Sequence, residues 1–377
     1  MNKWQKIRAD YPVFNHYTYL YTNGGAPVST PLINKAHQLL TTLSEKGRLI
    51  IPEWEQETRD TRQLLARMIH AQPHEIAFIN NTAHAMTLLQ DLFPKDHGVL
   101  SMRDDFPSSY VGWIHSGQPV VLVESQPDGT IDVAAIARQI TPETRLLVTS
   151  HVMFRTGFRQ DLAQIGDLCR QHQLIHIVDA TQSFGLFPID VQAYHIDVLI
   201  FHAYKWVNAG YGIGAMYISE KILAQYPAHA ANWQNVDYAQ PDFQTNTDYT
   251  KFTLKKDATV FEMGTLPYVN ILLLKAALEY LEAIGIGEIE SYVQTLVAYL
   301  GEKAAAHGIK WLTPYTPPHF SGIQRLRITP AQYATLQAEN IAARYSNEQL
   351  TVALSFYNNT ADIDHLFAVI GENTPGV

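Results

Sequence analysis

Short apolar runs alternate with amphipathic stretches over most of the first two thirds of the chain. The apolar runs are predicted strands, and they cover residues 76–80, 99–102, 120–123, 146–151, 174–179, 198–201 and 215–218. Helical spacing between them predicts helices over residues 83–93, 133–140 and 161–172, with Asp132 as an expected N-cap. Near-continuous apolar strands separated by helices are typical of a mostly parallel sheet covered on both faces. The pattern therefore predicts an α/β domain.

The pattern changes after residue 265. Two long helical stretches, residues 267–284 and 288–307, meet at a glycine turn. Shorter strands and helices follow, with strands predicted over residues 310–312, 323–328 and 351–356 and helices over 330–339 and 361–370. We therefore predict a large α/β domain over residues 21–265 and a smaller α+β domain over 266–377. The segment 1–20 is expected to pack on the smaller domain.

Composition and charge narrow the class of protein. The 377 residues include 27 Lys and Arg, 36 Asp and Glu and one cysteine, so the formal net charge is −9. This balance argues against a nucleic-acid binder or a protein of anionic membrane surfaces, because both need an excess of positive side chains. No apolar run approaches the roughly 18 residues of a membrane-spanning helix, and no export signal is recognisable. We expect a cytoplasmic enzyme, without a metal site or an internal disulfide.

Two charged residues stand where candidate chemistry is expected. One apolar strand ends in Asp179, and a second ends in Lys205. The carboxyl ends of parallel strands line the edge where open α/β sheets bind ligands. A lysine and a carboxylate at that edge suit pyridoxal 5'-phosphate, since the lysine forms a Schiff base with the aldehyde and the carboxylate pairs with the pyridinium nitrogen. The alternative is an ordinary ion pair, or two unrelated polar strand ends.

The residues around this pair carry a resemblance to a known family. The segments are VDATQSFGLFPIDV, HAYKW followed by GYGIGAMYI, FINNTAHAM, SHVMFRTG, FEMGTLP and SFYNNTADID. Together they resemble the class V aminotransferase family of fold-type I pyridoxal-phosphate enzymes, which includes cysteine desulfurases, kynureninases and isopenicillin N epimerase-like proteins. The resemblance extends from about residue 19 to residue 370. It implies a large domain built on a mostly parallel sheet and a smaller C-terminal domain.

The resemblance implies roles for the residues nearest the cofactor. Lys205 corresponds to the lysine that binds the cofactor and carries protons, and Asp179 to the partner of the pyridinium nitrogen. Gln182 is expected to meet the phenolate oxygen or the lysine, with a solvated turn glutamine as the alternative. Thr82 and Ala83 are expected to bind the phosphate, because a helix N-terminus exposes backbone N–H groups. Thr82 can also serve as a helix cap.

Further residues are assigned by the same resemblance. Phe106 corresponds to the ring that stacks on the cofactor, and Tyr204 to a kynureninase tyrosine that reaches the phosphate. His202 is expected to donate a hydrogen bond to the cofactor, although a buried core histidine is an equal alternative. Thr265 is implied to reach the phosphate of a neighbouring subunit, which implies a homodimer with shared active sites. The implied substrate-binding residues are Asn23, Gly24 and Arg155, with a plain turn as the alternative for Asn23 and Gly24.

Departures from the family pattern bear on the reaction. Desulfurases use a nucleophilic cysteine, whereas the only cysteine here, Cys169, lies on a predicted amphipathic helix where a buried packing role is expected. Relatives place an arginine for the substrate carboxylate where this chain has Thr351, and an asparagine where it has Met153 and Phe154. We therefore predict an aminotransferase acting on a small molecule with an amino group. The alternatives are a Cβ-cleaving lyase or hydrolase, an epimerase, and a non-catalytic binding protein with the same fold.

Overall fold

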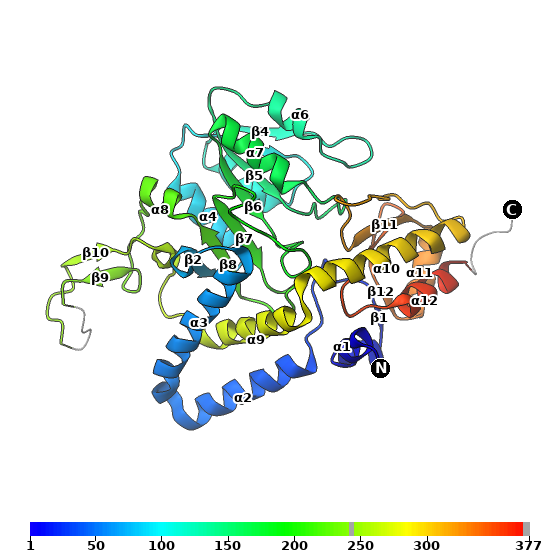
Figure 1. Cartoon of the computed structure of the whole chain (residues 1–377), viewed down its shortest axis with the longest axis horizontal. Coiled ribbons are helices and arrows are strands. Elements are labelled where there is room, and N and C mark those ends of the chain that lie inside the picture. The colour runs from blue at the N-terminus through cyan, green and yellow to red at the C-terminus, as the bar shows by residue number, and fades with distance from the viewer. Residues whose placement is uncertain (241–244, 372–377) are drawn as a thin grey trace.

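The computed structural model describes residues 1–240 and 245–371. Within them, the centre of the molecule is a seven-stranded sheet (Figure 1). Its strands, in spatial order, are β2 (Ile76–Ile79), β8 (Gly214–Ile218), β7 (Val198–His202), β6 (Ile175–Asp179), β5 (Thr144–Ser150), β3 (Gly98–Met102) and β4 (Val120–Val123). Only β8 runs antiparallel to its neighbours among these strands. The predicted α/β fold with a mostly parallel sheet is confirmed.

Helices cover both faces of this sheet, as its nearly continuous buried strands require. One face packs against α4 (Thr82–Leu92), α5 (Val111–His115) and α8 (Glu220–Gln225). The other face packs against α3 (Ile51–Ile69), α6 (Val133–Arg138), α7 (Leu162–His172) and α9 (Tyr268–Ile284). The predicted N-cap of α6 is confirmed, because the Asp132 carboxylate accepts a hydrogen bond of 2.9 Å from the Ala134 N–H.

A second, smaller part of the molecule follows α9. It contains a three-stranded antiparallel sheet, in the order β11 (Ile323–Arg327), β14 (Gln349–Ala353) and β13 (Arg344–Ser346). Three helices pack against it, namely α10 (Ile286–Ala306), α11 (Pro330–Ala338) and α12 (Thr360–Gly371). Figure 1 shows α9 beneath the large sheet and α10 beside the small one. The helix pair α9–α10 therefore joins the two parts, and the division at residue 265 remains a proposal.

The N-terminal segment contacts the smaller part. Helix α1 (Lys3–Ala9) is held by an ion pair between Arg8 and Asp362 at 2.7 Å, and β1 (Thr18–Tyr19) pairs with β12 (Ile341–Ala342). Tyr21 still contacts the smaller part through a bridge with Ala353 at the end of β14, and the chain then crosses to the large part, where the Ala26 N–H donates to the Tyr204 carbonyl at 2.8 Å. This crossing brings the segment after Tyr21 to the junction of the two parts.

Several elements were not predicted from the sequence. Helix α2 (Thr30–Lys46) and the first half of α3 precede the predicted α/β region, and a hairpin of β9 (Val236–Tyr238) and β10 (Phe252–Leu254) extends from the large part (Figure 1). The predicted strand over 310–312 is wrong, since only an isolated bridge between Trp311 and Leu326 forms there. Short 3-10 helices cover Pro12–Asn15, Gly47–Ile50, Pro73–Glu75, Pro107–Ser109 and Ala258–Phe261.

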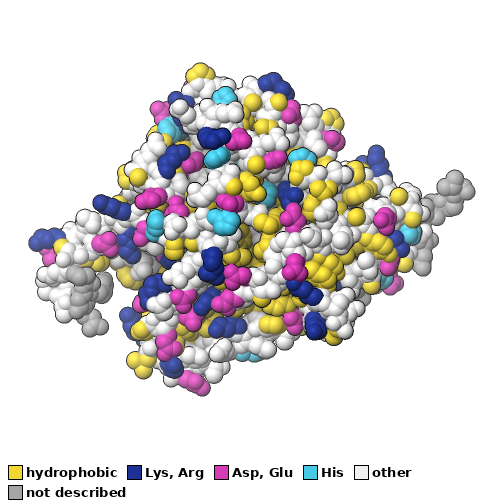
Figure 2. Space-filling view, viewed as in Figure 1, with side chains coloured by type: hydrophobic (Ala, Val, Ile, Leu, Met, Phe, Trp, Pro, Cys, Tyr) yellow, Lys and Arg dark blue, Asp and Glu magenta, His cyan; other side chains and the backbone are white. Residues whose placement is uncertain are grey.

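The distribution of charged side chains and the polarity of the helices agree with the amino-acid composition. Figure 2 shows positive and negative side chains interspersed over the visible face, rather than gathered in patches of one sign. Among the described residues, no helix is both long and apolar enough to cross a membrane.

Candidate active site

A cavity of about 280 Å³ opens at the carboxyl-end edge of the large sheet. The loops that follow β2, β3, β5, β6 and β7 all contribute to its wall. The lining residues are Asn81, Thr82, Ala83, Phe106, Ser108, Ser150, Phe154, Asp179, Thr181, Gln182, His202, Tyr204 and Lys205. Eight residues assigned by resemblance therefore meet at one place, although they come from four separate stretches of sequence.

Lys205 projects into this cavity from the turn after β7. The residue is 7% exposed, and burial lowers the pKa of its amine to about 8 from an ordinary 10.5. Asp179 opposes that shift by raising the pKa, whereas the positive charge of Arg344 adds to it. The amine lies 5.2 Å from the ring centre of Tyr204 and 6.0 Å from that of Phe106. Among the described residues it makes no hydrogen bond or ion pair, so it is free to react.

Asp179 ends β6 and lies on the floor of the cavity. Burial raises the pKa of its carboxyl group, and a hydrogen bond from the Thr181 N–H at 2.8 Å and the charge of Lys205 both lower it. That hydrogen bond goes to Oδ1, and a hydrogen bond from the Thr181 side chain lowers the pKa as well. A buried carboxylate needs a positive partner to stay ionised, and a protonated ring nitrogen would provide one.

The first turn of α4 forms one wall. Asn81 is the N-cap, because its side chain accepts a hydrogen bond of 2.9 Å from the His84 N–H. The interpretation of Thr82 as the cap is therefore wrong; its hydroxyl instead bonds to the hydroxyl of Thr181 at 2.9 Å. The backbone N–H groups of Thr82 and Ala83 have no partner within the helix, as at any helix start. They are suited to bind an anion.

Gln182 is held more firmly than a solvated turn residue would be. Its side-chain amide donates to the Asn23 carbonyl at 3.1 Å, and its oxygen accepts from the Trp206 indole at 2.9 Å. One N–H of the amide remains for a ligand. Gln182 therefore ties the N-terminal crossing segment to the lysine turn, in addition to lining the cavity.

Asp105 supports the cavity from behind, and sequence reasoning did not identify it. Its buried carboxylate accepts hydrogen bonds from the Ser150 N–H at 2.7 Å, the Ser150 hydroxyl at 2.5 Å and the Phe106 N–H at 2.6 Å. Burial and the charge of the nearby Asp179 raise its pKa to about 7, although the hydrogen bonds from Ser150 and Phe106 oppose that shift. The network fixes the loop that presents Phe106, which is 43% exposed and packs edge-on against Phe154.

His202 and Tyr204 lie on the approach to Lys205, with ring centres 4.4 Å apart. Burial, followed by the charge of Lys205, lowers the pKa of His202 to about 4, so the ring is neutral at pH 7. Its Nε2 atom is buried and has no hydrogen-bond partner among the described residues. An orphaned buried nitrogen beside a cavity indicates a missing partner, which a bound ligand can supply.

Four predicted residues do not line the cavity. Asn23 is buried behind Gln182, and Gly24 is exposed beside the ring of Tyr21. The side chain of Arg155 is 62% exposed and lies 3.9 Å from Asp104. Thr265 is exposed on a loop away from the cavity. Its role toward a neighbouring subunit therefore stays a prediction.

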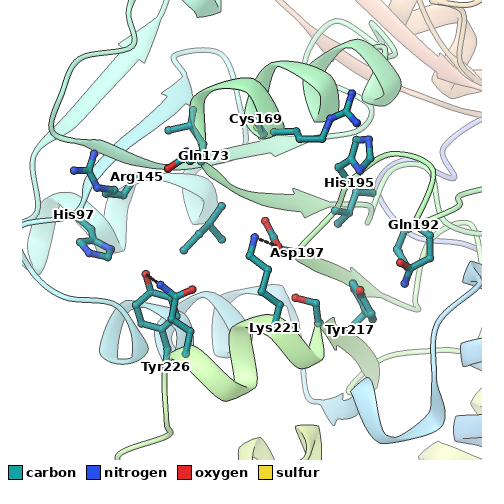
Figure 3. A pocket seen from close by; sticks show the side chains of 17 residues that line it. His97, Arg145, Cys169, Gln173, Gln192, His195, Asp197, Tyr217, Lys221 and Tyr226 are labelled. Carbon is teal, nitrogen blue, oxygen red and sulfur yellow. Dashed lines mark hydrogen bonds and ion pairs between the residues drawn. The ribbon is translucent and has the colours of Figure 1, made fainter.

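Cys169 lies at the opposite edge of the sheet, in the wall of a larger cavity of about 760 Å³ (Figure 3). The residue is 1% exposed on α7, and burial raises the pKa of its thiol far above the ordinary range. A thiol that stays protonated is a poor nucleophile. The lysine of this second cavity, Lys221, is paired with Asp197 at 3.1 Å. The cavity thus offers neither a reactive thiol nor an unpaired amine from these two residues.

Comparisons with known proteins agree with this geometry. The family model for aminotransferase class-V matches residues 18–345. The uncharacterized aminotransferase YcbU of Bacillus subtilis is 24% identical, over 98% of both chains, and a cysteine desulfurase of Escherichia coli is 26% identical, over 84% of this chain and 81% of its own.

Solved structures show the same fold. A cysteine desulfurase from Thermococcus onnurineus superimposes with a TM-score of 0.88 at 19% identity, covering 99% of this chain and 98% of its own. The cystine C–S lyase C-DES superimposes with a TM-score of 0.87 at 20% identity, covering 97% and 100%. The match over most of the sequence, together with the shared fold, shows that the chain belongs to the class V aminotransferase family of pyridoxal-phosphate enzymes.

Proposed function

We propose that this protein is an aminotransferase that takes the amino group from a small molecule and uses Lys205 to hold pyridoxal 5'-phosphate. The observation that carries the proposal is the single cavity shared by Lys205, Asp179 and the first turn of α4. A reactive amine, a carboxylate and an anion-binding helix start match the aldehyde, the ring nitrogen and the phosphate of one cofactor. The orphaned Nε2 of His202 supports the presence of a further polar partner there.

When bound, the cofactor supplies an electron-accepting ring that stabilises negative charge on the carbon beside the substrate nitrogen. Lys205 would hold the cofactor through its amine, and the same amine is placed to carry a proton to or from the substrate. The carboxylate of Asp179 would pair with the ring nitrogen and favour its protonated form. The N–H groups of Thr82 and Ala83 bind the phosphate with Tyr204, and Phe106 covers the ring. His202 donates a hydrogen bond from its neutral ring.

The second candidate is cleavage at Cβ by hydrolysis or elimination. It is favoured by Phe106 and Tyr204, which both stand beside the lysine as in kynureninases. A persulfide route through the protein's own cysteine is not proposed, because Cys169 is buried at the far edge of the sheet. Both candidates need the same cofactor and the same lysine.

The test is a substrate panel on the purified, cofactor-loaded protein. Amino acids and amines that perturb the visible spectrum would be assayed for three products: keto acid together with aminated acceptor, ammonia, and pyruvate. Transfer of the amino group to an added keto acid supports the aminotransferase. Ammonia and pyruvate without an aminated acceptor would favour Cβ cleavage by elimination, and a spectrum that no compound perturbs would contradict both candidates.

A further inference from the structure

In the small sheet, two arginines flank Thr351, the position at which relatives place an arginine. In the register of the sheet, Thr351 on β14 lies opposite Arg325 on β11 and opposite Arg344 on β13. Directly opposed residues of antiparallel strands project from the same face. Arg325, Thr351 and Arg344 therefore form a row on one face, with about 10 Å between the outer Cα atoms, which is two strand spacings. We call these three residues the arginine row.

This face is the polar one. The neighbouring residues of the same strands, Gln324, Leu326, Leu350 and Val352, are fully buried. Because side chains alternate along a strand, the arginine row points away from the core of the smaller part. Arg325 is partly buried and Arg344 is exposed.

The row lies next to the contact between the smaller part and the lysine turn. Two residues before Arg325, the Ile323 carbonyl fills the space left by Gly157, where an added Cβ would lie 2.2 Å away. The preceding Gly322 contacts the indole of Trp206, the neighbour of Lys205, where a Cβ would lie 2.7 Å from the ring. A two-residue step along a strand covers about 7 Å. The arginine row therefore lies about 7 Å along β11 from the contact between the smaller part and the lysine turn.

The two guanidinium groups have no anionic partner of their own. Over residues 1–240 and 245–371, neither group makes a hydrogen bond or an ion pair, whereas the guanidinium of Arg8 is bonded to a carboxylate. The pKa of Arg325 is lowered by burial and by the charges of Arg155 and Arg327, against the opposing effects of Tyr315 and Asp104. Positive side chains held together in this way favour an anionic ligand.

The two arginines stand in different surroundings. The positive charge of Arg344 lowers the pKa of the Lys205 amine, whereas the pKa of Arg325, at the other end of the row, responds to the charges of Arg155 and Asp104. A substrate whose amino group is at Lys205 would thus meet Arg344 first and Arg325 farther out. Arginine binds carboxylates through two parallel hydrogen bonds, which suits both places.

We propose that Arg344 binds the α-carboxylate of the substrate and Arg325 binds a second anionic group, so that the substrate is an amino acid with an acidic side chain. The inference rests on the proposed function, since it assumes an amino-acid substrate at Lys205. It assigns the carboxylate-binding role, which the family pattern places at position 351, to the neighbouring strand.

The test compares three matched variants of the cofactor-loaded protein: Arg344→Gln, Arg325→Gln and, as the control, Arg327→Gln. Arg327 lies on the same strand two residues from Arg325, but it is more exposed and pairs with Glu348 at 3.4 Å. KM would be measured for L-glutamate, L-aspartate and L-alanine. Binding of glutarate, which has two carboxylates and no amino group, would be measured by calorimetry. Arg344→Lys separates loss of charge from loss of the planar fork.

We expect Arg344→Gln to raise KM at least about tenfold for all three amino acids, and Arg325→Gln to raise it by that factor only for the two acidic ones. Both should weaken glutarate binding, and Arg327→Gln should change neither quantity. Unchanged KM values in both variants, or wild-type turnover of alanine as efficient as that of glutamate, would overturn the inference. If no amino acid perturbs the cofactor spectrum at all, the proposed function fails instead.

Discussion

The lowered pKa of Lys205 makes a quantitative prediction about reactivity. An amine attacks an aldehyde only in its neutral form, and the pKa of Lys205 is about 8 because the residue is buried. At pH 7 the neutral fraction is then about one in eleven, compared with about one in three thousand for an ordinary lysine. Lys205 should therefore present the reactive form about 300-fold more often than an exposed lysine at that pH.

The assay follows covalent labelling of the cofactor-free protein by a small amine-directed reagent between pH 6 and pH 11. Peptide mapping gives the rate constant at Lys205 for each pH, with a free lysine peptide as the control. We expect the Lys205 rate to reach half its maximum near pH 8. In Asp179→Asn the midpoint should move lower, because the carboxylate charge raises the pKa of the amine.

Two outcomes would refute this reasoning. A midpoint near pH 10.5 would show that the amine is solvated in the free protein, so that burial does not determine its pKa. An upward move of the midpoint in Asp179→Asn would show that the two side chains do not interact as a pair of opposite charges.

Three further predictions concern the carboxylates and the thiol. Asp179→Asn should still bind the cofactor but lose turnover by at least about a hundredfold, equivalent to about 2.7 kcal/mol of barrier, and near-normal kcat would show that Asp179 is only structural. Cys169→Ala should retain cofactor loading and turnover and lose about 1 kcal/mol of unfolding free energy in urea, since the residue only packs; abolished activity with an intact fold would reopen a thiol mechanism. Glu262→Gln should lower the unfolding free energy by about 3–5 kcal/mol, because it leaves the Arg62 charge buried without its partner at 2.6 Å. A loss below about 1 kcal/mol would show that water solvates the Arg62 guanidinium in the variant.

The sequence predicted the large sheet well because its strands, apart from the edge strand β4, are buried on both faces. Their apolar runs have no other interpretation, and observed strand ends differ from the predicted ones by at most two residues. Helices α2 and α3 were largely missed, since few of their first positions are buried, and α2 also exposes apolar side chains such as Leu40. The strand predicted around Trp311 does not form, because Trp311 pairs with Leu326 of β11 only through an isolated bridge.

Most residues of the candidate site were identified from family motifs rather than from the pattern of apolar and polar positions. The sequence supplied Lys205 and Asp179 as strand ends, and the resemblance supplied their companions. Neither source identified Asp105, whose hydrogen bonds to Ser150 cross from one loop to another. Arg344 was missed for a similar reason, since only strand pairing reveals that it lies opposite Thr351. Contacts between segments far apart in sequence leave no local signal.

The central claim is that Lys205 holds the cofactor, and one measurement tests it most directly. The cofactor-loaded protein would be reduced with borohydride, digested and mapped by mass spectrometry. We predict the pyridoxyl group on Lys205, and no stable adduct in Lys205→Ala. Recovery of the label on Lys221 or Lys251, with Lys205 unmodified, would contradict the account.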